Sequence, residues 1–302
     1  MPVKIKEVAN QPYEEWKAER VDYIGGSEAA AVLGFNPYVS KVVLYMEKTG
    51  QYSREASSEA AEWGNILEPV LRKEFAKRIN AERAENGLPP LRVQQRKAIF
   101  AHDKYNYIRT NLDGLIFNHE LGTGVLEIKT ANQYLADEWA GDDVPNHYFI
   151  QVQHNLAVMD LKFAYLAVLI GGQRYKHYYI ERDEELISNM IDLERKFWEE
   201  NVLKRIPPEM DGHDSTVEMM KFMYPQSEPT IMELPFEAQD WVEKLELYKN
   251  SEKELKELKQ EVQNLIKDAM KENGEAWAGP HKVTWKTAKN GVRALKYKLG
   301  SK

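Results

Sequence analysis

The sequence predicts a core of mixed helices and strands, α/β or α+β, over roughly the first 205 residues. Three observations support this prediction. Helical segments precede a group of strand-like runs, and helices and strands then alternate, which is typical of a sheet covered by helices. Beyond residue 207 a proline-rich stretch leads into a charged helix with a seven-residue apolar repeat. We therefore expect one large folded core followed by a helical extension.

The first part of the core is predicted to be helical. Short helices are expected over 11–19, 29–33 and 40–48. A long helix is expected over 57–80, where apolar residues recur near helical spacing. These residues are Trp63, Leu67, Leu71 and Phe75. Their spacing predicts that one side of the helix packs on the core.

The sheet is predicted from the runs that follow. Four strands are expected over 92–100, 105–109, 113–117 and 125–130. A helix over 146–159 then leads to two strands, 162–170 and 173–180, and Gly171-Gly172 between them is a hairpin signal. A helix over 183–203 closes the core, and its acidic first turn suits the helix dipole.

The remaining residues differ in composition. The stretch 207–237 contains five prolines and is interpreted as a linker. Over 238–272 a charged helix carries an apolar heptad seam. The seam consists of Trp241, Tyr248, Leu255, Val262 and Ala269. A basic β-hairpin is expected after it, and the predicted organisation is a core over 1–206, the linker, and an extension over 238–302.

Composition restricts the function classes. The chain has 302 residues, 43% of them hydrophobic, and no cysteine, so disulfides and cysteine-bound clusters are excluded. No membrane span or signal peptide is evident, and the cytoplasm is the expected compartment. The net charge is −7, so any DNA contacts must be concentrated in a groove or pore.

Three charged residues on two neighbouring predicted strands form the most informative pattern. Glu127 and Lys129 are two residues apart and project to the same face of a strand, and Asp113 can join them. A solvated sheet edge is the simpler explanation for such charges. Leu126 and Ile128 are apolar, however, so the charges alternate with buried positions. A hard divalent cation would offset the repulsion between the acids, and the pattern indicates metal-dependent phosphodiester cleavage.

Four motifs in one order give a family resemblance over about residues 18–200. They are 63–68 (WGNILE), 112–114 (LDG), 126–129 (LEIK) and 150–153 (IQVQ). The chain resembles the YqaJ-type viral recombinases, the family of the lambda exonuclease, within the PD-(D/E)xK nuclease superfamily. The family's usual proline is Leu112 here. The resemblance implies an α/β fold, with a central mixed sheet flanked by helices.

The resemblance also implies roles for individual residues. Asp113, Glu127 and the Ile128 carbonyl would bind Mg²⁺, with Mn²⁺ expected to substitute, and Lys129 would hold and polarise the attacking water. Glu68 would complete a metal shell, and Gln151 would support the lysine and the nucleophile. Asp103 is either a further acid of the site or a plain surface aspartate. His147 and His154, seven residues apart, lack the further ligands of a zinc site.

A second site is implied just before the short helix expected over 29–33. In this family an arginine and a serine near a Gly-Gly-Ser-Glu turn resemble a pocket for a DNA 5′-phosphate, and the matching residues are Arg20 and Ser27. Two alternatives remain open. Ser27 is also a plausible helix N-cap, and Arg20 could instead form a surface salt bridge with Glu15 or Glu19.

The resulting hypothesis is a metal-dependent exonuclease that resects linear double-stranded DNA from the 5′ end. The resemblance implies a phage or prophage protein acting in a bacterial host cell, with a RecT-like single-strand annealing protein as partner and a homo-oligomer, preferably a trimer. An endonuclease or repair nuclease on the same core is the alternative enzyme. A catalytically idle scaffold for DNA ends or proteins is the alternative outside enzymes, although every metal position carries a competent residue.

Overall fold

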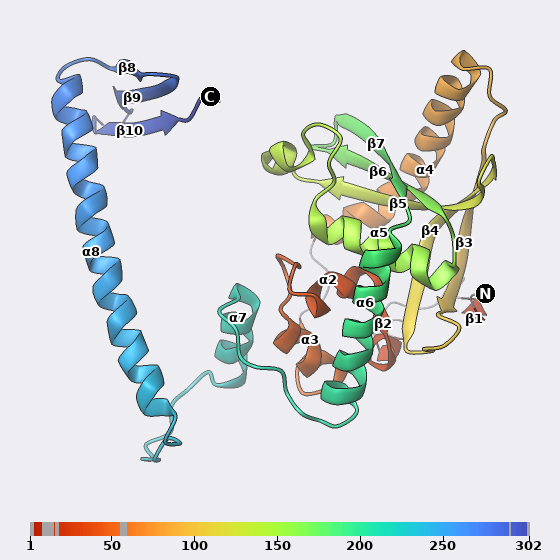
Figure 1. Ribbon diagram of the computed structural model, residues 1–302, viewed down its shortest axis with the longest axis horizontal. Helices are drawn as coiled ribbons and strands as arrows, with labels where there is room; N and C mark the ends of the chain where they lie inside the picture. The colour runs from red at the N-terminus through yellow and green to blue at the C-terminus, as the bar shows by residue number, and fades with distance from the viewer. Residues whose placement is uncertain (1–2, 8–14, 16–17, 55–58, 290, 301–302) are drawn as a thin grey trace. The chain divides into compact units, whose positions relative to one another are not determined.

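The computed structural model describes residues 3–7, 15, 18–54, 59–289 and 291–300 (Figure 1). The chain divides into two compact units, Met1–Ser227 and Glu228–Lys302. The helix expected over 11–19 falls largely outside the described residues. None of the helices in the described ranges has the length and apolar character that crossing a bilayer requires.

A seven-stranded mixed sheet forms the centre of the first unit. Its strands are β1 (Val3–Glu7), β2 (Ile24–Gly25), β3 (Arg92–Ala101), β4 (Ile108–His119), β5 (Gly122–Ala131), β6 (Phe163–Ile170) and β7 (Arg174–Glu181). The spatial order is β1-β3-β4-β5-β6-β7, and β2 pairs with β4. The pairs β5–β6 and β2–β4 are parallel and the others antiparallel, so the predicted mixed sheet is confirmed. Gly171 and Gly172, both with positive φ, form the predicted turn between β6 and β7.

The prediction of separate strands over 105–109 and 113–117 is wrong. The single strand β4 runs through both, because it pairs with β3 continuously from Arg109 to Phe117 apart from local register shifts. Leu112, in the supposed gap, is buried in the sheet core. Asp113 therefore lies inside a strand and not at its end, and the surrounding sheet fixes its backbone.

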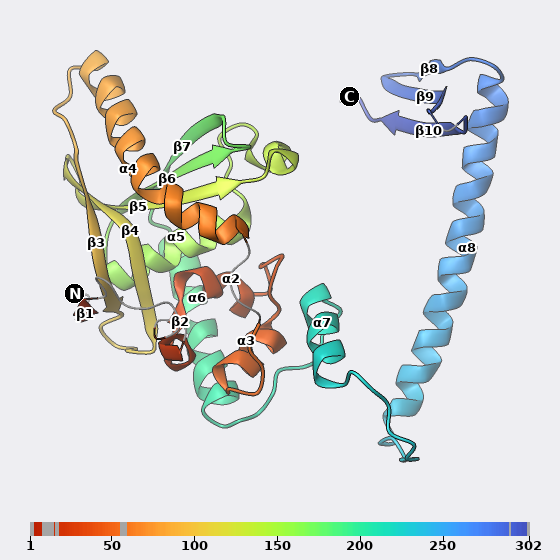
Figure 2. The ribbon, with the colours of Figure 1, turned by 180° about the vertical axis from the view of Figure 1, so that it is seen from behind.

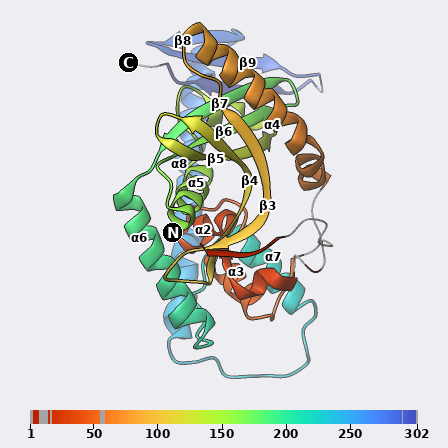
Figure 3. The ribbon, with the colours of Figure 1, turned by 90° about the vertical axis from the view of Figure 1, so that its right-hand side faces the viewer.

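Helices cover both faces of this sheet (Figures 2 and 3). The helices of the core are α2 (Gly26–Val32), α3 (Lys41–Lys48), α4 (Glu59–Glu85), α5 (Asn146–Met159) and α6 (Glu184–Lys196), the last continued by a π-helical turn, Phe197–Val202. Helix α4 packs on one face, while α5, with α2 and α6 against it, packs on the other. The expected α/β arrangement is confirmed.

The alternation of β6 shows why this sequence builds two layers. Phe163 and Tyr165 pack on the α4 side, whereas Leu166 and Val168 pack on the α5 side. Because side chains alternate along a strand, a run that is apolar throughout serves both faces. Fully burying one such large side chain contributes about 1.5–3 kcal/mol. Trp63 is an exception to the predicted apolar face of α4, because 52% of its surface is exposed.

The predicted linker contains a helix, α7 (Asp214–Met223), which the sequence interpretation missed. Ser215 Oγ accepts a hydrogen bond of 3.0 Å from the Ser40 backbone nitrogen, and Met219 is completely buried against residues of α3. The prolines on both sides of this helix favoured the linker interpretation. The core therefore extends past residue 206, and the boundary lies between Ser227 and Glu228.

The second unit contains the predicted long helix, α8 (Ala238–Met270), and a small antiparallel sheet. The sheet consists of β8 (Glu275–Ala278), β9 (His281–Thr287) and β10 (Arg293–Lys298) in the order β10-β9-β8. The predicted basic hairpin is β9–β10, and β8 was not anticipated. In α8, the heptad residues Trp241, Tyr248 and Leu255 are exposed within this chain.

Candidate active site

The sheet opens beside Asp113. On one edge of β4, β5 pairs from Gly114 onward, whereas β2 pairs with Ile108 and Arg109. The two partners leave a gap between them, and Asp113 lies at its border. Asp113 Oδ2 accepts a 2.7 Å hydrogen bond from the Ile128 backbone nitrogen. A side chain thus supplies the acceptor where the ladder between β4 and β5 ends.

Glu127 and Lys129 project from β5 toward α5, as their two-residue spacing predicts. Lys129 Nζ lies 2.7 Å from Glu127 Oε1, and Gln151 Nε2 donates to the same oxygen at 2.6 Å. Asn155 Nδ2 donates to the other oxygen, Oε2, at 3.0 Å. Glu127 is only 2% exposed, so these donors provide its solvation in place of water. Three of the predicted residues, Glu127, Lys129 and Gln151, are therefore in direct contact.

The charges of this cluster influence each other. Burial raises the pKa of Asp113 well above its usual range, and the negative charge of Glu127 adds to this effect. Burial opposes the charge of Lys129, but the carboxylates of Glu127 and Asp113 outweigh it and raise the lysine pKa. Lys129 is accordingly an ammonium at neutral pH. Its Nζ also lies 5.3 Å from the centre of the Tyr148 ring.

Glu68 reaches this region from α4, on the opposite face of the sheet. Its carboxylate is bonded to Arg72, whose Nε donates to the Asp113 carbonyl oxygen at 2.8 Å. Burial raises the pKa of Glu68, Arg72 lowers it, and the charge of Glu127 raises it again, with a net upward shift. The Arg72 bridge brings Glu68 next to Asp113, and the role of Glu68 in a metal shell stays a prediction.

The fit of a divalent cation can be judged from the donor atoms. Within the described part of the chain, no three His, Asp or Glu side chains converge closely enough to form a complete protein cage for a metal. Magnesium does not require one, because it usually keeps several waters and takes one or two carboxylates. Asp113 and Glu127, with the Ile128 carbonyl, have this composition. A cation would offset the negative charge of Glu127, which adds to the effect of burial in raising the pKa of Asp113.

Asp103 is not brought to this cluster. It lies on the loop between β3 and β4, half exposed, with its carboxylate 3.4 Å from His102 Nδ1. From Ile108 to Asp113 there are five residues of strand, roughly 16 Å at 3.3 Å each. The arrangement fits the surface alternative, and a role as a further acid stays a prediction.

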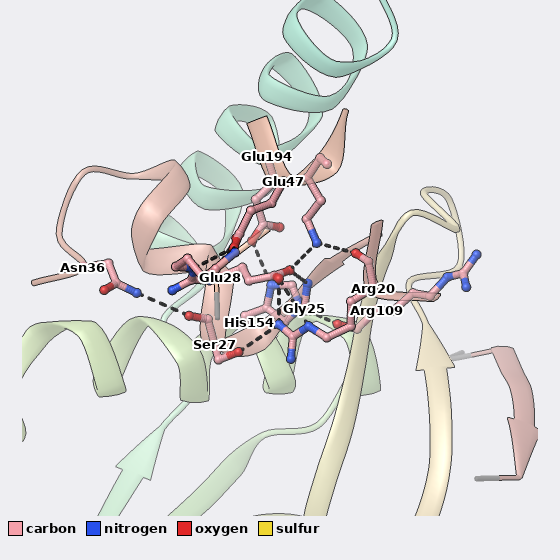
Figure 4. A network of polar contacts seen from close by, with 11 residues as sticks. Arg20, Gly25, Ser27, Glu28, Asn36, Glu47, Arg109, His154 and Glu194 are labelled. Atoms are coloured by element: carbon pink, nitrogen blue, oxygen red, sulfur yellow. Dashed lines mark hydrogen bonds and ion pairs between the residues drawn. The ribbon is translucent and has the colours of Figure 1, made fainter. Parts of the chain in front are cut away.

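The second predicted pair, Arg20 and Ser27, is brought together (Figure 4). Arg20 donates to Ser27 Oγ at 3.1 Å, and its guanidinium lies 2.7 Å from Glu28 Oε1. Glu28 Oε2 accepts from the Gly25 nitrogen and from Lys48 Nζ, both at 2.8 Å. Lys48 also donates to the Arg20 carbonyl oxygen. Two cations and one anion are therefore held around the Gly25–Ser27 turn.

This network gives Arg20 a partner that the sequence interpretation did not consider. Its guanidinium forms a salt bridge with Glu28 of α2. Burial opposes the charge of Glu28, but Arg20 and Lys48 outweigh it and lower its pKa to about 2. The N-cap of α2 is Gly25, and the Glu28 carboxylate completes a capping box there, so Ser27 is not the cap.

Asn155 is the principal residue that sequence reasoning missed. It follows Gln151 by four positions on α5, so both side chains lie on one helix face, and this spacing was the available signal. Its Oδ1 accepts a 2.6 Å hydrogen bond from Thr110 Oγ1, which sets the amide so that Nδ2 faces Glu127. Lys48 and Glu28, from separate helices, gave no comparable signal.

Gly26 joins the two parts of the site. A Cβ atom at this position would lie 2.5 Å from Asn155 Oδ1, closer than real contacts allow. Glycine therefore lets the turn that carries Ser27 lie directly on the amide that orients Glu127. The Arg20 network and the carboxylate cluster share α5 as a common wall.

Comparisons with known proteins identify the family of this chain. The YqaJ-like viral recombinase domain matches residues 15–162, and the HSCB C-terminal oligomerisation domain matches residues 237–300. An alkaline exonuclease from Laribacter hongkongensis aligns with a TM-score of 0.49 and 20% identity over 64% of this chain and 94% of that one. A phage-related exonuclease from Haemophilus somnus 129PT aligns with a TM-score of 0.43 and 13% identity over 61% of this chain and 96% of that one.

Protein YqaJ of Bacillus subtilis (strain 168) is 35% identical over 277 residues, covering 90% of this chain and 83% of that protein. Because this identity extends over most of both proteins, the chain belongs to the YqaJ-like viral recombinase family.

Proposed function

We propose that this chain is a metal-dependent exonuclease that degrades one strand of linear double-stranded DNA from its 5′ end. The observation that supports it most is the joint projection of Glu127 and Lys129 from β5, beside Asp113 of β4 and Gln151 of α5. Family membership supports a nuclease role in recombination. Polarity, Mg²⁺ as the metal and the annealing partner are parts of the proposal.

Asp113, Glu127 and the Ile128 carbonyl would hold Mg²⁺, with Mn²⁺ as a substitute. When bound, the ion would lower the pKa of a coordinated water molecule and would stabilise negative charge on the phosphate. Lys129 remains protonated because the neighbouring carboxylates raise its pKa. It therefore orients the water and offsets developing negative charge, and it does not act as the base. Gln151 fixes the Glu127 oxygen that faces Lys129.

Arg20 and Ser27 are proposed to bind the 5′-phosphate of the DNA end. The Arg20 guanidinium pairs with Glu28 Oε1 and the Lys48 ammonium with Glu28 Oε2, so these three groups together carry one positive charge in excess. A phosphate can accept charge-assisted hydrogen bonds from such a group. Because Gly26 lies on Asn155, a phosphate held here would lie within one helix width of Glu127.

The second unit is proposed to serve assembly. Residues 237–300 match an oligomerisation domain, and the heptad side chains of α8 are exposed within this chain. A repeat of this kind favours helix association. The proposed assembly is a homo-oligomer, preferably a trimer, and the proposed partner is a RecT-like single-strand annealing protein that receives the exposed strand.

The direct test uses linear duplexes labelled at either end, with and without a 5′-phosphate, beside a closed circle. The proposal expects progressive loss of the 5′-labelled strand in Mg²⁺ or Mn²⁺, no cutting in EDTA, and no cutting of the circle. Equal cutting of the circle would indicate an endonuclease. Binding without cutting in every divalent metal would indicate a scaffold.

Lys129→Ala is the first variant to test in this assay. Removing the ammonium should lower the cleavage rate by about 10²–10³-fold, because a preorganised charge aimed at the phosphate is lost. DNA binding should stay near wild type. Lys162→Ala, at an exposed lysine just before β6, is the matched control. Near wild-type turnover of Lys129→Ala would remove this lysine from the mechanism.

A further inference from the structure

A cleft of about 420 Å³ opens at the end of β5, one residue beyond Lys129. Its walls come from the first turn of α4, the last residues of β5, the beginning of the 3₁₀ helix η2 (Gln133–Trp139) and the turn between β6 and β7. None of the residues that line it is charged. Its size falls in the range of sites for small organic groups, roughly 300–1,000 Å³.

Two aromatic side chains border this cleft. Trp63 of α4 is 52% exposed and Tyr134 of η2 is 85% exposed, although both could offer a large area for packing. The Tyr134 position is well defined by its backbone. Asn132 caps η2, and its Oδ1 accepts a 3.0 Å hydrogen bond from the Tyr134 nitrogen. The ring is thus presented to solvent from an ordered helix start.

The opposite wall approaches closely because of one glycine. Gly171 has φ +59°, and its nitrogen donates to the Ala131 carbonyl oxygen at 2.8 Å. A Cβ atom on Gly171 would lie 2.8 Å from Gln133 Cβ, so a larger residue would displace Gln133. The turn therefore holds the side chain of Gln133 at the cleft. Its amide is a group that pairs with the edges of bases.

The cleft lies at the end of the strand that carries Lys129. Thr130, which lines it, directly follows Lys129 and projects to the α4 side of β5, as Ile128 does, whereas Lys129 projects toward α5. The cleft and the proposed catalytic cluster therefore flank the same end of β5. An uncharged lining lacks the positive charge that attracts a phosphate, whereas aromatic faces stack on any base. We propose that the cleft binds a nucleobase of the strand being cleaved, stacked on Trp63 and Tyr134. This inference rests on the proposed nuclease function and adds a contact to the base.

The test measures binding of short 5′-phosphorylated duplexes by fluorescence anisotropy, with the full chain carrying Lys129→Ala so that the DNA stays intact. One duplex is complete, and the others lack the base at one of the terminal positions. Trp63→Ala and Tyr134→Ala should each weaken binding of the complete duplex about tenfold, since one stacked base contributes roughly 1–3 kcal/mol. With the base missing at the contacted position, these variants should bind as well as the Lys129→Ala protein.

Two controls define the outcome. Tyr134→Phe keeps the ring and should bind normally, and Tyr224→Ala removes a tyrosine that is 65% exposed but does not line the cleft. Equal losses on complete and base-free duplexes at every position would overturn the base site, even if the chain cuts linear DNA as proposed. If the chain never cuts DNA but the loss depends on one base, the base site stands and the proposed nuclease function fails.

Discussion

A single carboxylate, Glu127, receives hydrogen bonds from three nitrogen groups in this structure. Lys129 and Gln151 share one oxygen, and Asn155 holds the other. The lysine supplies charge, whereas the two amides supply direction and leave the net charge unchanged. Because Thr110 in turn fixes the Asn155 amide, the orientation of Glu127 depends on β4, β5 and α5 together.

Asn155→Ala should weaken Mg²⁺ binding or activity by about 10–100-fold, a typical cost of losing a group that orients a metal ligand. Calorimetric titration of Mg²⁺ in the absence of DNA checks this separately from cleavage. Asn146→Ala, an exposed asparagine on the same helix, is the control and should change neither quantity. Unchanged Mg²⁺ affinity and rate in Asn155→Ala would mean that the amide is only part of the packing.

Arg20→Ala should slow the processing of 5′-phosphorylated ends about tenfold or more, because a hydrogen bond to a charged group contributes roughly 1.5–3 kcal/mol. Ends with a 5′-hydroxyl should be affected much less. Arg54→Ala is the matched control, since Arg54 also pairs with a glutamate, Glu47. If Arg20→Ala slows both kinds of end equally, its role is to hold Glu28 and not a phosphate.

At the scale of elements, α5 and α6 are joined by a buried ion pair. His154 Nδ1 lies 2.8 Å from Glu194 Oε1, and Nε2 lies 2.9 Å from the Arg109 carbonyl oxygen (Figure 4). Both partners only accept hydrogen bonds, so both ring nitrogens must donate and the ring is an imidazolium. Burial opposes this charge, but Glu194 outweighs it and raises the pKa of His154.

A raised histidine pKa makes stability depend on pH. The contribution of the pair is fully present below the unfolded value of about 6.5 and is lost as pH rises through the higher folded pKa. Glu194→Gln should lower the free energy of unfolding by about 3 kcal/mol at neutral pH, and this difference should shrink at alkaline pH. Urea unfolding across pH checks it, with Glu184→Gln on the same helix as control. A difference that is constant with pH would show that the pair is not charged.

The elements that the sequence predicted correctly are those with a strong local signal. The period of two in 126–129, the Gly171-Gly172 turn and the acidic start of α6 each reflect forces within a few residues. The continuity of β4 could not be predicted from the sequence, since it depends on pairing with β3, which joins residues far apart in the chain. The Arg20–Glu28–Lys48 network likewise depends on how α2 and α3 pack, although Arg20 and Ser27 were identified by resemblance.

For the whole molecule, the division after Ser227 decides what can be removed. A chain ending at Ser227 should remain folded and keep nuclease activity, because all the proposed catalytic residues precede it. It should show a smaller assembly by light scattering and weaker binding to a RecT-like annealing protein. A truncated chain with an unchanged assembly and unchanged partner binding would exclude both roles for residues 228–302.

A chain ending at Arg205 provides the contrast. It also lacks α7, so the Ser40 nitrogen loses the Ser215 hydroxyl and the site of Met219 is exposed. Uncovering a side chain of this size costs about 1.5–3 kcal/mol. The unfolding temperature should therefore fall below that of the chain ending at Ser227. Equal melting curves for the two truncated chains would mean that α7 adds nothing to the core.

The pairing of β1 with β3 determines the order in which the sheet can be completed during synthesis. Val3 pairs with Ala101, so at about 5–20 residues per second β1 leaves the ribosome roughly 5–20 seconds before its partner. During that interval β1 is an unpaired strand, and its alternating lysines keep it from pairing with other chains. The Gly25–Ser27 turn beside Arg20 can pack only later, because α5, the helix that it packs against, is translated after the first five strands. The nascent chain therefore carries Arg20 and Ser27, the residues of the proposed phosphate pocket, well before the pocket can form.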